Sequence, residues 1–333
     1  MQTVSVNVSN LCVPCCNRCR YCLLSWDGQL RGVDYGRSTA YARRFYNWLR
    51  ENRPELSFAF YYGYSMEHPH LLESVSFLRE IGSPGGQFLQ LNGMKFRDEH
   101  EIRELLTALK AHGIALINLT FYGTREYHDR FAARSGDFNY LMTILRTAGE
   151  VGLAVEVGIP LTRENAKQAA DLMEQLRRYR PNHIFCFVPH GEGRGETLES
   201  VRLRQSDYEC LPDEVKALFN RGKYRSEGEW VRMNSFSEPT KRVLTLNLSP
   251  ENIDRFEKQE FSETIRSLEK LDDEYYAAIP DLASLAKRYG DPDGECFYSR
   301  RDLYLKYQRR YILEHHLTLQ DVNDERFCFS RRF

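Results

Sequence analysis

The sequence predicts an α/β fold, in which residues 1–195 form a partial (β/α)6 TIM-like barrel and residues 196–333 form a C-terminal α+β extension. Two observations predict this fold. Short apolar segments of strand length alternate with segments of helix length through the first two thirds of the chain, and after about residue 195 this pattern gives way to charged segments with only short strand candidates. Strands that alternate with helices usually lie parallel and are joined by right-handed crossovers, which produce either a barrel or an open sheet. Six strands favour an incomplete barrel.

Six strands and five intervening helices are expected in the first part. The strands are predicted at 4–8, 56–62, 88–91, 114–121, 155–159 and 183–188, and the helices at 39–51, 69–80, 98–111, 138–151 and 163–178. Asp98 is a suitable N-cap for the third helix, and Gly152 follows the fourth helix where chains commonly leave the helical conformation. In such folds the reacting groups lie at the carboxyl ends of the strands, which is where the cysteine loop is expected.

The last third of the chain has a different pattern. Charged segments dominate it, with short strands predicted at 230–233 and 243–248 and long helices at about 262–276 and 301–316. We therefore divide the chain near residue 195, and we expect residues 196–333 to form a substrate or lid domain over the open rim of the barrel.

Composition restricts the classes of function. Lys and Arg number 46 against 47 Asp and Glu, which gives a net charge of -1 and argues against a general nucleic-acid or acidic-lipid binder. No apolar run approaches the roughly 18 residues of a membrane span, and the first residues lack the pattern of a secretory signal. We expect a cytoplasmic protein with no membrane association, whose thiols stay reduced.

The chain has 9 cysteines, and they are unevenly distributed, with five of them between Cys12 and Cys22. Cys15, Cys19 and Cys22 have the spacing C-x3-C-x2-C, which suits three irons of a [4Fe–4S] cluster with the fourth iron open, because each thiolate binds one iron. Zinc held by two C-x-x-C pairs is an alternative, although zinc ribbons usually place about 15–20 residues between the pairs. The loop could instead be a ferredoxin-type run beginning at Cys16, or an accidental group of buried thiols.

With this loop the chain resembles the radical S-adenosylmethionine (SAM) enzymes. The cysteine motif follows a first short strand and has the aromatic Tyr21 before its last cysteine, as in that family. The turn at Asn92 and Gly93, the stretch 121–138 and the turn 160–165 resemble the family's segments after its third, fourth and fifth strands.

One segment departs from the family pattern. After the second strand the family often has Gly-Gly-Glu-Pro, whose backbone takes the amino group of SAM. Here Tyr64 and Ser65 replace the usual residues, while Gly63 still permits a close backbone approach.

The resemblance implies an activity and a set of cofactor contacts. The open iron would bind SAM, a reducing partner such as flavodoxin or ferredoxin would supply an electron, and the resulting 5′-deoxyadenosyl radical would abstract hydrogen from a substrate carbon. His128 and Asp129 are expected to cap the local turns, and no residue is assigned as a catalytic acid or base. The expected SAM contacts are Tyr21 at the adenine, Gly63, Tyr64 and Ser65 at the amino group, Asn118 and Thr120 at the ribose, Arg134 at the carboxylate and Glu156 at the ribose or the substrate.

The resemblance leaves the class of substrate open. The stretch 121–138 resembles enzymes that modify ribosomal peptides, so a peptide is the expected substrate, and a sugar, nucleoside or other small metabolite is the alternative. No C-x-x-C pair follows Cys22, which argues against further clusters. The alternative to an enzyme is a non-catalytic iron–sulfur protein that transfers electrons or acts as a sensor.

Overall fold

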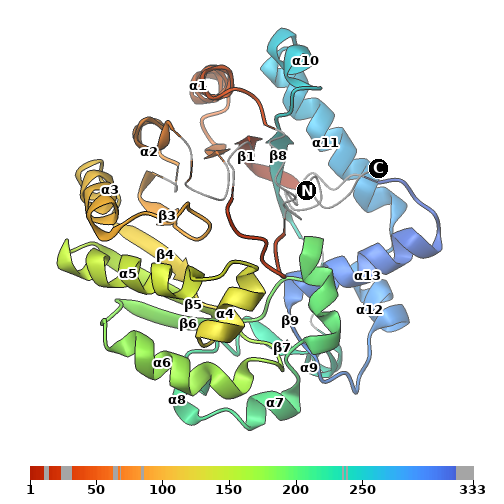
Figure 1. Ribbon diagram of the computed structural model, residues 1–333. Helices are drawn as coiled ribbons and strands as arrows, with labels where there is room; N and C mark the ends of the chain where they lie inside the picture. Colours follow the sequence, from red (N-terminus) through yellow and green to blue (C-terminus); the bar gives the residue numbers. More distant parts are fainter. Residues whose placement is uncertain are drawn as a thin grey trace.

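The strands of the first two thirds of the chain run parallel, as their alternation with helices predicts. The computed structural model describes residues 1–10, 15–23, 32–62, 67, 69–83, 86–234, 236–237 and 239–319. Helices cover the outer side of the strands (Figure 1), so the predicted α/β fold is confirmed. The six predicted strands are β1 (Gln2–Asn10), β2 (Ser57–Tyr62), β3 (Phe88–Gln90), β4 (Leu116–Thr120), β5 (Ala154–Pro160) and β6 (His183–Phe187).

The predicted crossover helices are also present. They are α1 (Tyr35–Asn52), α2 (Leu71–Glu80), α3 (Glu99–Ala111), α5 (Asp137–Glu150) and α6 (Ala169–Arg177), the last preceded by the short η2 (Ala166–Gln168). Asp98 caps α3 as expected, because its carboxylate accepts the Glu101 N–H and the Glu101 carboxylate accepts the Asp98 N–H, both at 2.9 Å. A further short helix, α4 (Arg125–Ala132), lies between β4 and α5 and was not predicted as a separate element.

The strands form two parallel sheets rather than one continuous barrel. One sheet has the order β3–β4–β5–β6, and the other has the order β2–β1–β8, where β8 (Lys241–Asn247) comes from the last third of the chain. Gln2 lies opposite Lys241 and Ser9 lies opposite Asn247 in the β1–β8 pair. The strand predicted at 243–248 therefore forms, and it joins the sheet of the first strand. The division of the chain at residue 195 stays a prediction, but the two parts share this sheet.

The last third of the chain is mostly helical. The helices predicted at 262–276 and 301–316 are α11 (Phe261–Ala278) and α13 (Arg300–Glu314). Strands β7 (Tyr224–Ser226) and β9 (Phe297–Ser299) form a small antiparallel pair. The remaining elements are η3 (Gly193–Val201), α7 (Gln205–Glu209), α8 (Asp213–Lys216), α9 (Glu227–Met233), α10 (Ile253–Lys258) and α12 (Leu282–Tyr289).

The strand predicted at 230–233 is wrong, because these residues belong to α9. A capping box starts this helix: the Glu229 N–H donates to Ser226 Oγ at 3.2 Å, and the Ser226 N–H donates to the Glu229 carboxylate at 2.8 Å. The sequence from Trp230 to Met233 predicts a short strand, but the cap a few residues earlier decides the local conformation.

Two apolar cores hold the sheets against the helices. The larger lies between the β3–β6 sheet and helices α3, α5 and α6, and the second lies between the β2–β1–β8 sheet and helices α1 and α11. Phe45 of α1 stacks on Phe261 of α11 with 4.7 Å between ring centroids.

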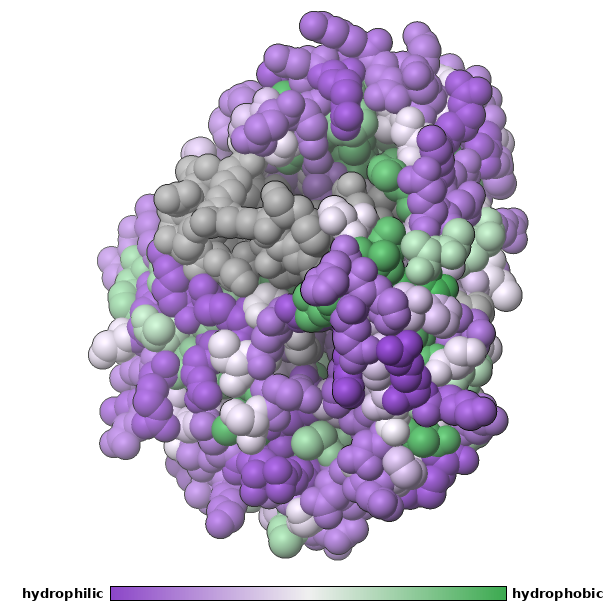
Figure 2. Space-filling view, turned by 90° about the vertical axis from the view of Figure 1, so that its right-hand side faces the viewer, coloured by the Kyte–Doolittle hydropathy of each residue, from purple (hydrophilic) through white to green (hydrophobic). Residues whose placement is uncertain are grey.

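Hydrophilic residues cover most of the face seen in Figure 2. Among the described residues, no helix combines the length and the apolar character needed to cross a membrane.

A buried ion pair joins β8 to α11. The Arg242 side chain is 7% exposed and that of Asp272 is 0% exposed, and Arg242 Nη1 lies 3.2 Å from Asp272 Oδ2. Arg242 also donates from Nε to Thr3 Oγ1 of β1 at 3.0 Å. Burial raises the pKa of Asp272, and the Arg242 guanidinium opposes that rise. One side chain thus ties together both strands and the helix that covers them.

We predict that Arg242→Ala lowers the free energy of unfolding by about 3–5 kcal/mol, because it leaves the Asp272 carboxyl buried without its cation. Urea denaturation followed by circular dichroism measures the change. The double variant Arg242→Met/Asp272→Leu removes both charges and should lose less stability than the single variant. An Arg242→Ala protein as stable as the wild type would contradict the importance of this pair.

Candidate active site at the barrel rim

The cysteine loop begins near the carboxyl end of β1 and is fixed by backbone hydrogen bonds to two other segments. The Cys16 N–H donates to the Gly93 carbonyl after β3, and the Arg18 N–H donates to the Ala132 carbonyl at the end of α4, both at 2.8 Å. Within the loop, the Cys22 N–H donates to the Cys19 carbonyl at 3.2 Å. These bonds give the thiols a defined position at the rim formed by the carboxyl ends of the strands.

The thiols of the triplet influence one another. Burial raises the pKa of Cys15 to about 11 and that of Cys19 to about 12, and the neighbouring Cys22 adds to both shifts by charge repulsion. The Sγ atom of Cys19 lies 3.1 Å from the Tyr122 hydroxyl. Thiolates held this way are stable only beside a positively charged group, because both burial and mutual repulsion favour the neutral thiols.

This donor set fits an iron–sulfur cluster. Within the part of the chain that the structure describes, no three His, Cys, Asp or Glu side chains are close enough together to hold a single metal ion. A [4Fe–4S] cube is larger and takes one thiolate per iron, so its cysteine ligands stand apart around it. Cys12, which the zinc alternative needs, lies outside the described residues.

Tyr21 lies beside the triplet in an aromatic group. Its ring packs edge-on against Tyr122, with 5.4 Å between centroids, and lies 5.9 Å from Phe131. Its hydroxyl is hydrogen-bonded to Thr120 and Tyr122, and burial raises its pKa above the ordinary value. The structure thus brings together two predicted cofactor residues, Tyr21 and Thr120. Their contacts with SAM stay predictions.

The predicted residues Asn118 and Glu156 form part of a polar row across the β3–β6 sheet. Gln90 lies opposite Asn118, Asn118 opposite Glu156, and Glu156 opposite His183. Asn118 Nδ2 donates to Glu156 Oε1 at 3.1 Å, and the other Glu156 oxygen lies 3.2 Å from His183 Nδ1. The alternate residues on these strands, such as Ile117, pack into the helix-covered core, so the polar row faces the inside of the partial barrel.

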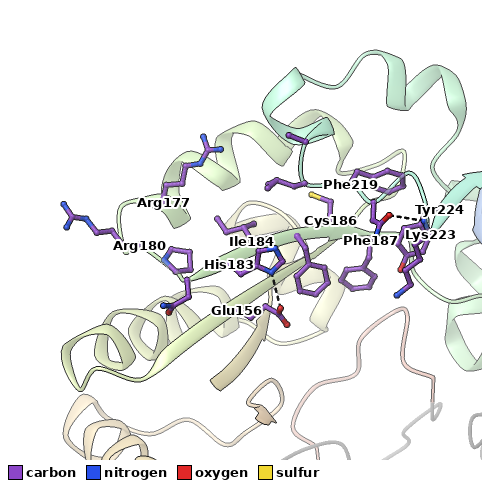
Figure 3. A pocket seen from close by; sticks show the side chains of 16 residues that line it. Glu156, Arg177, Arg180, His183, Ile184, Cys186, Phe187, Phe219, Lys223 and Tyr224 are labelled. Atoms are coloured by element: carbon purple, nitrogen blue, oxygen red, sulfur yellow. Dashed lines mark hydrogen bonds and ion pairs between the residues drawn. The ribbon is translucent and has the colours of Figure 1, made fainter. Parts of the chain in front are cut away.

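A hollow of about 780 Å³ lies beside this row, along β6 and the residues 217–220 that bridge to its outer edge (Figure 3). Three rings follow one another along β6: His183 stacks on Phe185, and Phe185 lies against Phe187, each pair with 5.8 Å between centroids. Gly158 makes room for them, because a Cβ there would lie 3.1 Å from the Phe185 ring. The hollow therefore offers a carboxylate, an imidazole and an aromatic wall to a ligand.

The loop is also anchored through a buried carboxylate, Asp137, at the start of α5. Asn17 Nδ2 donates to Asp137 Oδ2 at 3.0 Å, and Arg134 Nη1 lies 3.1 Å from Asp137 Oδ1. His128 Nε2 lies 3.1 Å from Asp137 Oδ2, while the Tyr122 N–H donates to His128 Nδ1. Because Nδ1 accepts this hydrogen bond, Nε2 carries the ring hydrogen and donates it to Asp137. The cysteine loop, α4 and α5 meet at this one group.

The remaining predicted residues are placed as follows. Arg134 contacts Asp137, and its Nη1 also donates to Asn17 Oδ1 at 3.2 Å and to the Met94 carbonyl at 2.6 Å. Arg134 therefore supports the cysteine loop. Its contact with the SAM carboxylate stays a prediction. Asp129 caps α5, as expected, by accepting the N–H groups of Gly136 and Phe138. The predicted contacts of the SAM amino group, Gly63, Tyr64 and Ser65, lie outside the described residues.

The glycine-rich segment after β6 packs against the cysteine loop, which the sequence did not predict. The Arg194 N–H donates to the Cys22 carbonyl and Arg194 Nε to the Cys19 carbonyl, both at 3.0 Å. Gly193 has φ 56, and a Cβ there would lie 2.2 Å from the Leu23 carbonyl oxygen. Only glycine fits this contact. The signal in the sequence was the spacing of glycines in 191–195, which does not by itself reveal the partner.

The same segment carries a histidine–aspartate pair that sequence reasoning also missed. His190 Nδ1 lies 2.8 and 3.0 Å from the two carboxylate oxygens of Asp302, in the first turn of α13. The Asp302 side chain is 4% exposed and that of His190 is 31% exposed. A buried carboxylate that accepts the Nδ1 hydrogen leaves Nε2 able to accept a proton. The two residues are 112 positions apart, so only the fold brings them together.

We predict that Asp137→Ala lowers the free energy of unfolding by about 3 kcal/mol, because Arg134 and His128 lose their shared buried acceptor. Urea denaturation measures this change. Glu174→Ala, which removes one half of an exposed ion pair with Arg178, is the control and should change stability by less than about 0.5 kcal/mol. Equal effects of the two variants would contradict the role of Asp137.

The fold is similar to that of several solved enzymes. SuiB of Streptococcus suis, bound to its precursor peptide SuiA, matches with 12% sequence identity and a TM-score of 0.52, over 78% of this chain and 62% of SuiB. This chain thus spans less than two thirds of SuiB, and at this identity the likeness concerns the fold alone. Coproporphyrinogen III oxidase (HemN) of Escherichia coli matches with 13% identity and a TM-score of 0.43, over 93% of this chain and 91% of that one. The enzyme anSMEcpe with bound AdoMet matches with 17% identity and a TM-score of 0.44, over 64% and 60% of the two chains.

The comparison with protein families is more specific than the likeness in fold. No curated protein sequence matches this chain. The family model described as the Radical SAM superfamily matches residues 10–176, which is half of the chain and includes the cysteine loop, the rim turns and strands β2 to β5. The protein therefore belongs to the radical SAM superfamily of enzymes.

Proposed function

We propose that Cys15, Cys19 and Cys22 hold a [4Fe–4S] cluster and that the enzyme modifies a ribosomally made peptide. The observation that carries the first part is the position of the three thiols. They share one loop, which is fixed at the strand ends and carries Tyr21, whose hydroxyl is hydrogen-bonded to Thr120 of β4. Superfamily membership makes the protein an enzyme, so the electron-transfer or sensor alternative is not adopted.

A [4Fe–4S] cluster held by these thiolates would supply the chemistry for reductive cleavage of SAM to methionine and a 5′-deoxyadenosyl radical, which would abstract a hydrogen atom from the substrate. The protein's part is to position the reactants and to exclude water. In this proposal Tyr21 contacts the adenine, Asn118 and Thr120 contact the ribose, and Arg134 contributes to the carboxylate site. Glu156 lies at the level of Asn118, next to the hollow along β6, so it faces either the ribose or the substrate.

The hollow along β6 supports a peptide as the substrate. It is open at the edge of the sheet, so an extended chain can place one side chain against Phe185 and Phe187 while the rest stays outside. SuiB, whose fold is similar, was solved with a precursor peptide. We infer a similar class of substrate here, together with an external one-electron donor and a reducing, cytoplasmic environment in which the thiols persist.

We predict that anaerobic reconstitution gives iron and sulfide in the wild-type protein and that Cys19→Ala loses most of both, because the variant removes one ligand of the cluster. Iron and acid-labile sulfide assays and the visible absorption spectrum measure the loss. Cys210→Ala is the control, since Cys210 is exposed and lies outside the loop. Full iron content in Cys19→Ala would overturn the ligand assignment, and stoichiometric zinc without visible absorption would favour the zinc alternative.

We predict that the reconstituted protein, reduced with dithionite, converts SAM to methionine and 5′-deoxyadenosine, and that Cys19→Ala does not. When a short peptide encoded beside its gene is added, the mass of that peptide should change, as measured by mass spectrometry, because a new bond formed at the carbon that loses hydrogen alters the peptide's hydrogen count. Cleavage of SAM with no change in any peptide, but turnover of a sugar or nucleoside, would replace the peptide with a small metabolite.

A further inference from the structure

The hydroxyl of Tyr122 reaches a thiol of the triplet from inside the protein. Its oxygen lies 3.1 Å from Cys19 Sγ, and the whole residue is only 1% exposed. A cysteine that binds a metal does so as a thiolate, which has lost its hydrogen. When Cys19 is a ligand, the hydrogen of this contact must therefore come from Tyr122, and the hydroxyl donates to a negatively charged sulfur.

The neighbours of Tyr122 fix the direction of its hydroxyl. The ring stacks on His128 and on Phe131, with 4.8 and 4.7 Å between centroids, and Tyr21 packs edge-on against it at 5.4 Å. The backbone is held as well, because its N–H donates to His128 Nδ1 and its carbonyl accepts from Asn165 Nδ2 at 2.6 Å. The ring cannot turn away from Cys19 without displacing packed side chains, so the donor is in place in advance.

A second hydroxyl supports this donor. The Tyr21 hydroxyl is hydrogen-bonded both to Tyr122 and to Thr120. While Tyr122 donates to Cys19, its oxygen can still accept a hydrogen bond from Tyr21. Hydrogen bonds that follow one another in a buried chain polarise each other, which strengthens the last one. The sulfur of Cys19 therefore lies at the end of a short chain of hydroxyl groups.

Such a hydrogen bond acts differently on the two redox states of an iron–sulfur cluster. Reduction adds one negative charge to the cluster and its thiolates, and part of this charge resides on the sulfurs. A donor aimed at a ligand sulfur stabilises the more negative state more strongly, so it raises the reduction potential. Burial increases the effect, because little water is present to screen the charge.

Resting on the cluster part of the proposed function, we propose that Tyr122 is a positioning residue that donates a hydrogen bond to the Cys19 thiolate and thereby makes the cluster easier to reduce. Tyr122 acts through Cys19 rather than on the substrate. In the reduction step an external donor loses one electron and the cluster gains it. No bond forms or breaks, and the Tyr122 hydroxyl keeps its hydrogen.

The test is a redox titration of the reconstituted protein without SAM, followed by electron paramagnetic resonance. Tyr122→Phe removes the hydroxyl and keeps the ring. We expect it to lower the equilibrium constant for one-electron reduction about tenfold, which makes the potential more negative by about 59 mV. An unchanged potential in Tyr122→Phe would overturn the proposal.

The matched control is Tyr127→Phe. Tyr127 is also buried and belongs to the same aromatic cluster, but its hydroxyl donates to Glu164 at 2.9 Å and not to a thiol. This variant loses a tyrosine hydroxyl from the same cluster and should keep the wild-type potential. An equal shift in both variants would show a general effect of the aromatic cluster and would overturn the role of Tyr122.

Iron and sulfide assays separate this proposal from the proposed function. Tyr122→Phe should hold as much iron and sulfide as the wild type, because its three thiolates remain. A wild-type protein that binds no iron would overturn the proposed function itself. If Tyr122→Phe does not retain the cluster, fluorotyrosine at position 122 takes its place. Fluorine makes the hydroxyl a stronger donor, so the potential should rise, and an unchanged or lower potential would contradict the proposal.

Discussion

The buried carboxylate of Asp137 is the contact on which the arrangement of the rim depends. It accepts from Asn17 and His128 and lies against the guanidinium of Arg134, so the cysteine loop, α4 and α5 share one anion. A buried carboxylate is costly unless its partners are in place, which ties the position of the loop to the folding of both helices. The position of the cysteine loop is therefore tied to this one carboxylate.

The two faces of the β3–β6 sheet carry different kinds of side chain. Residues such as Ile117, Val155 and Ile184 fill the core beneath the helices, while alternate positions place Asn118 and Glu156 inside the partial barrel. This alternation follows from the two-residue repeat of a strand. Because the sheet ends at β6 in the described residues, the polar row opens into the hollow there rather than being closed off.

The last third of the chain takes part in both sheet and site. It supplies β8 beside β1, and its helix α13 supplies the Asp302 carboxylate that orients His190 at the rim. Gly193 and Arg194, just after β6, brace the cysteine loop from another side. The last third of the chain is thus joined both to the sheet of the first strand and to the rim.

The sequence by itself determined the six strands, the helices between them and the cysteine loop by which the chain resembles its superfamily, because periodicity and cysteine spacing are local signals. The strand predicted at 230–233 was wrong, because the Ser226–Glu229 cap favours a helix there. Only the tertiary structure decided that Arg134 braces the loop and that His190 meets Asp302. These depend on side chains from distant segments meeting, which no local pattern encodes.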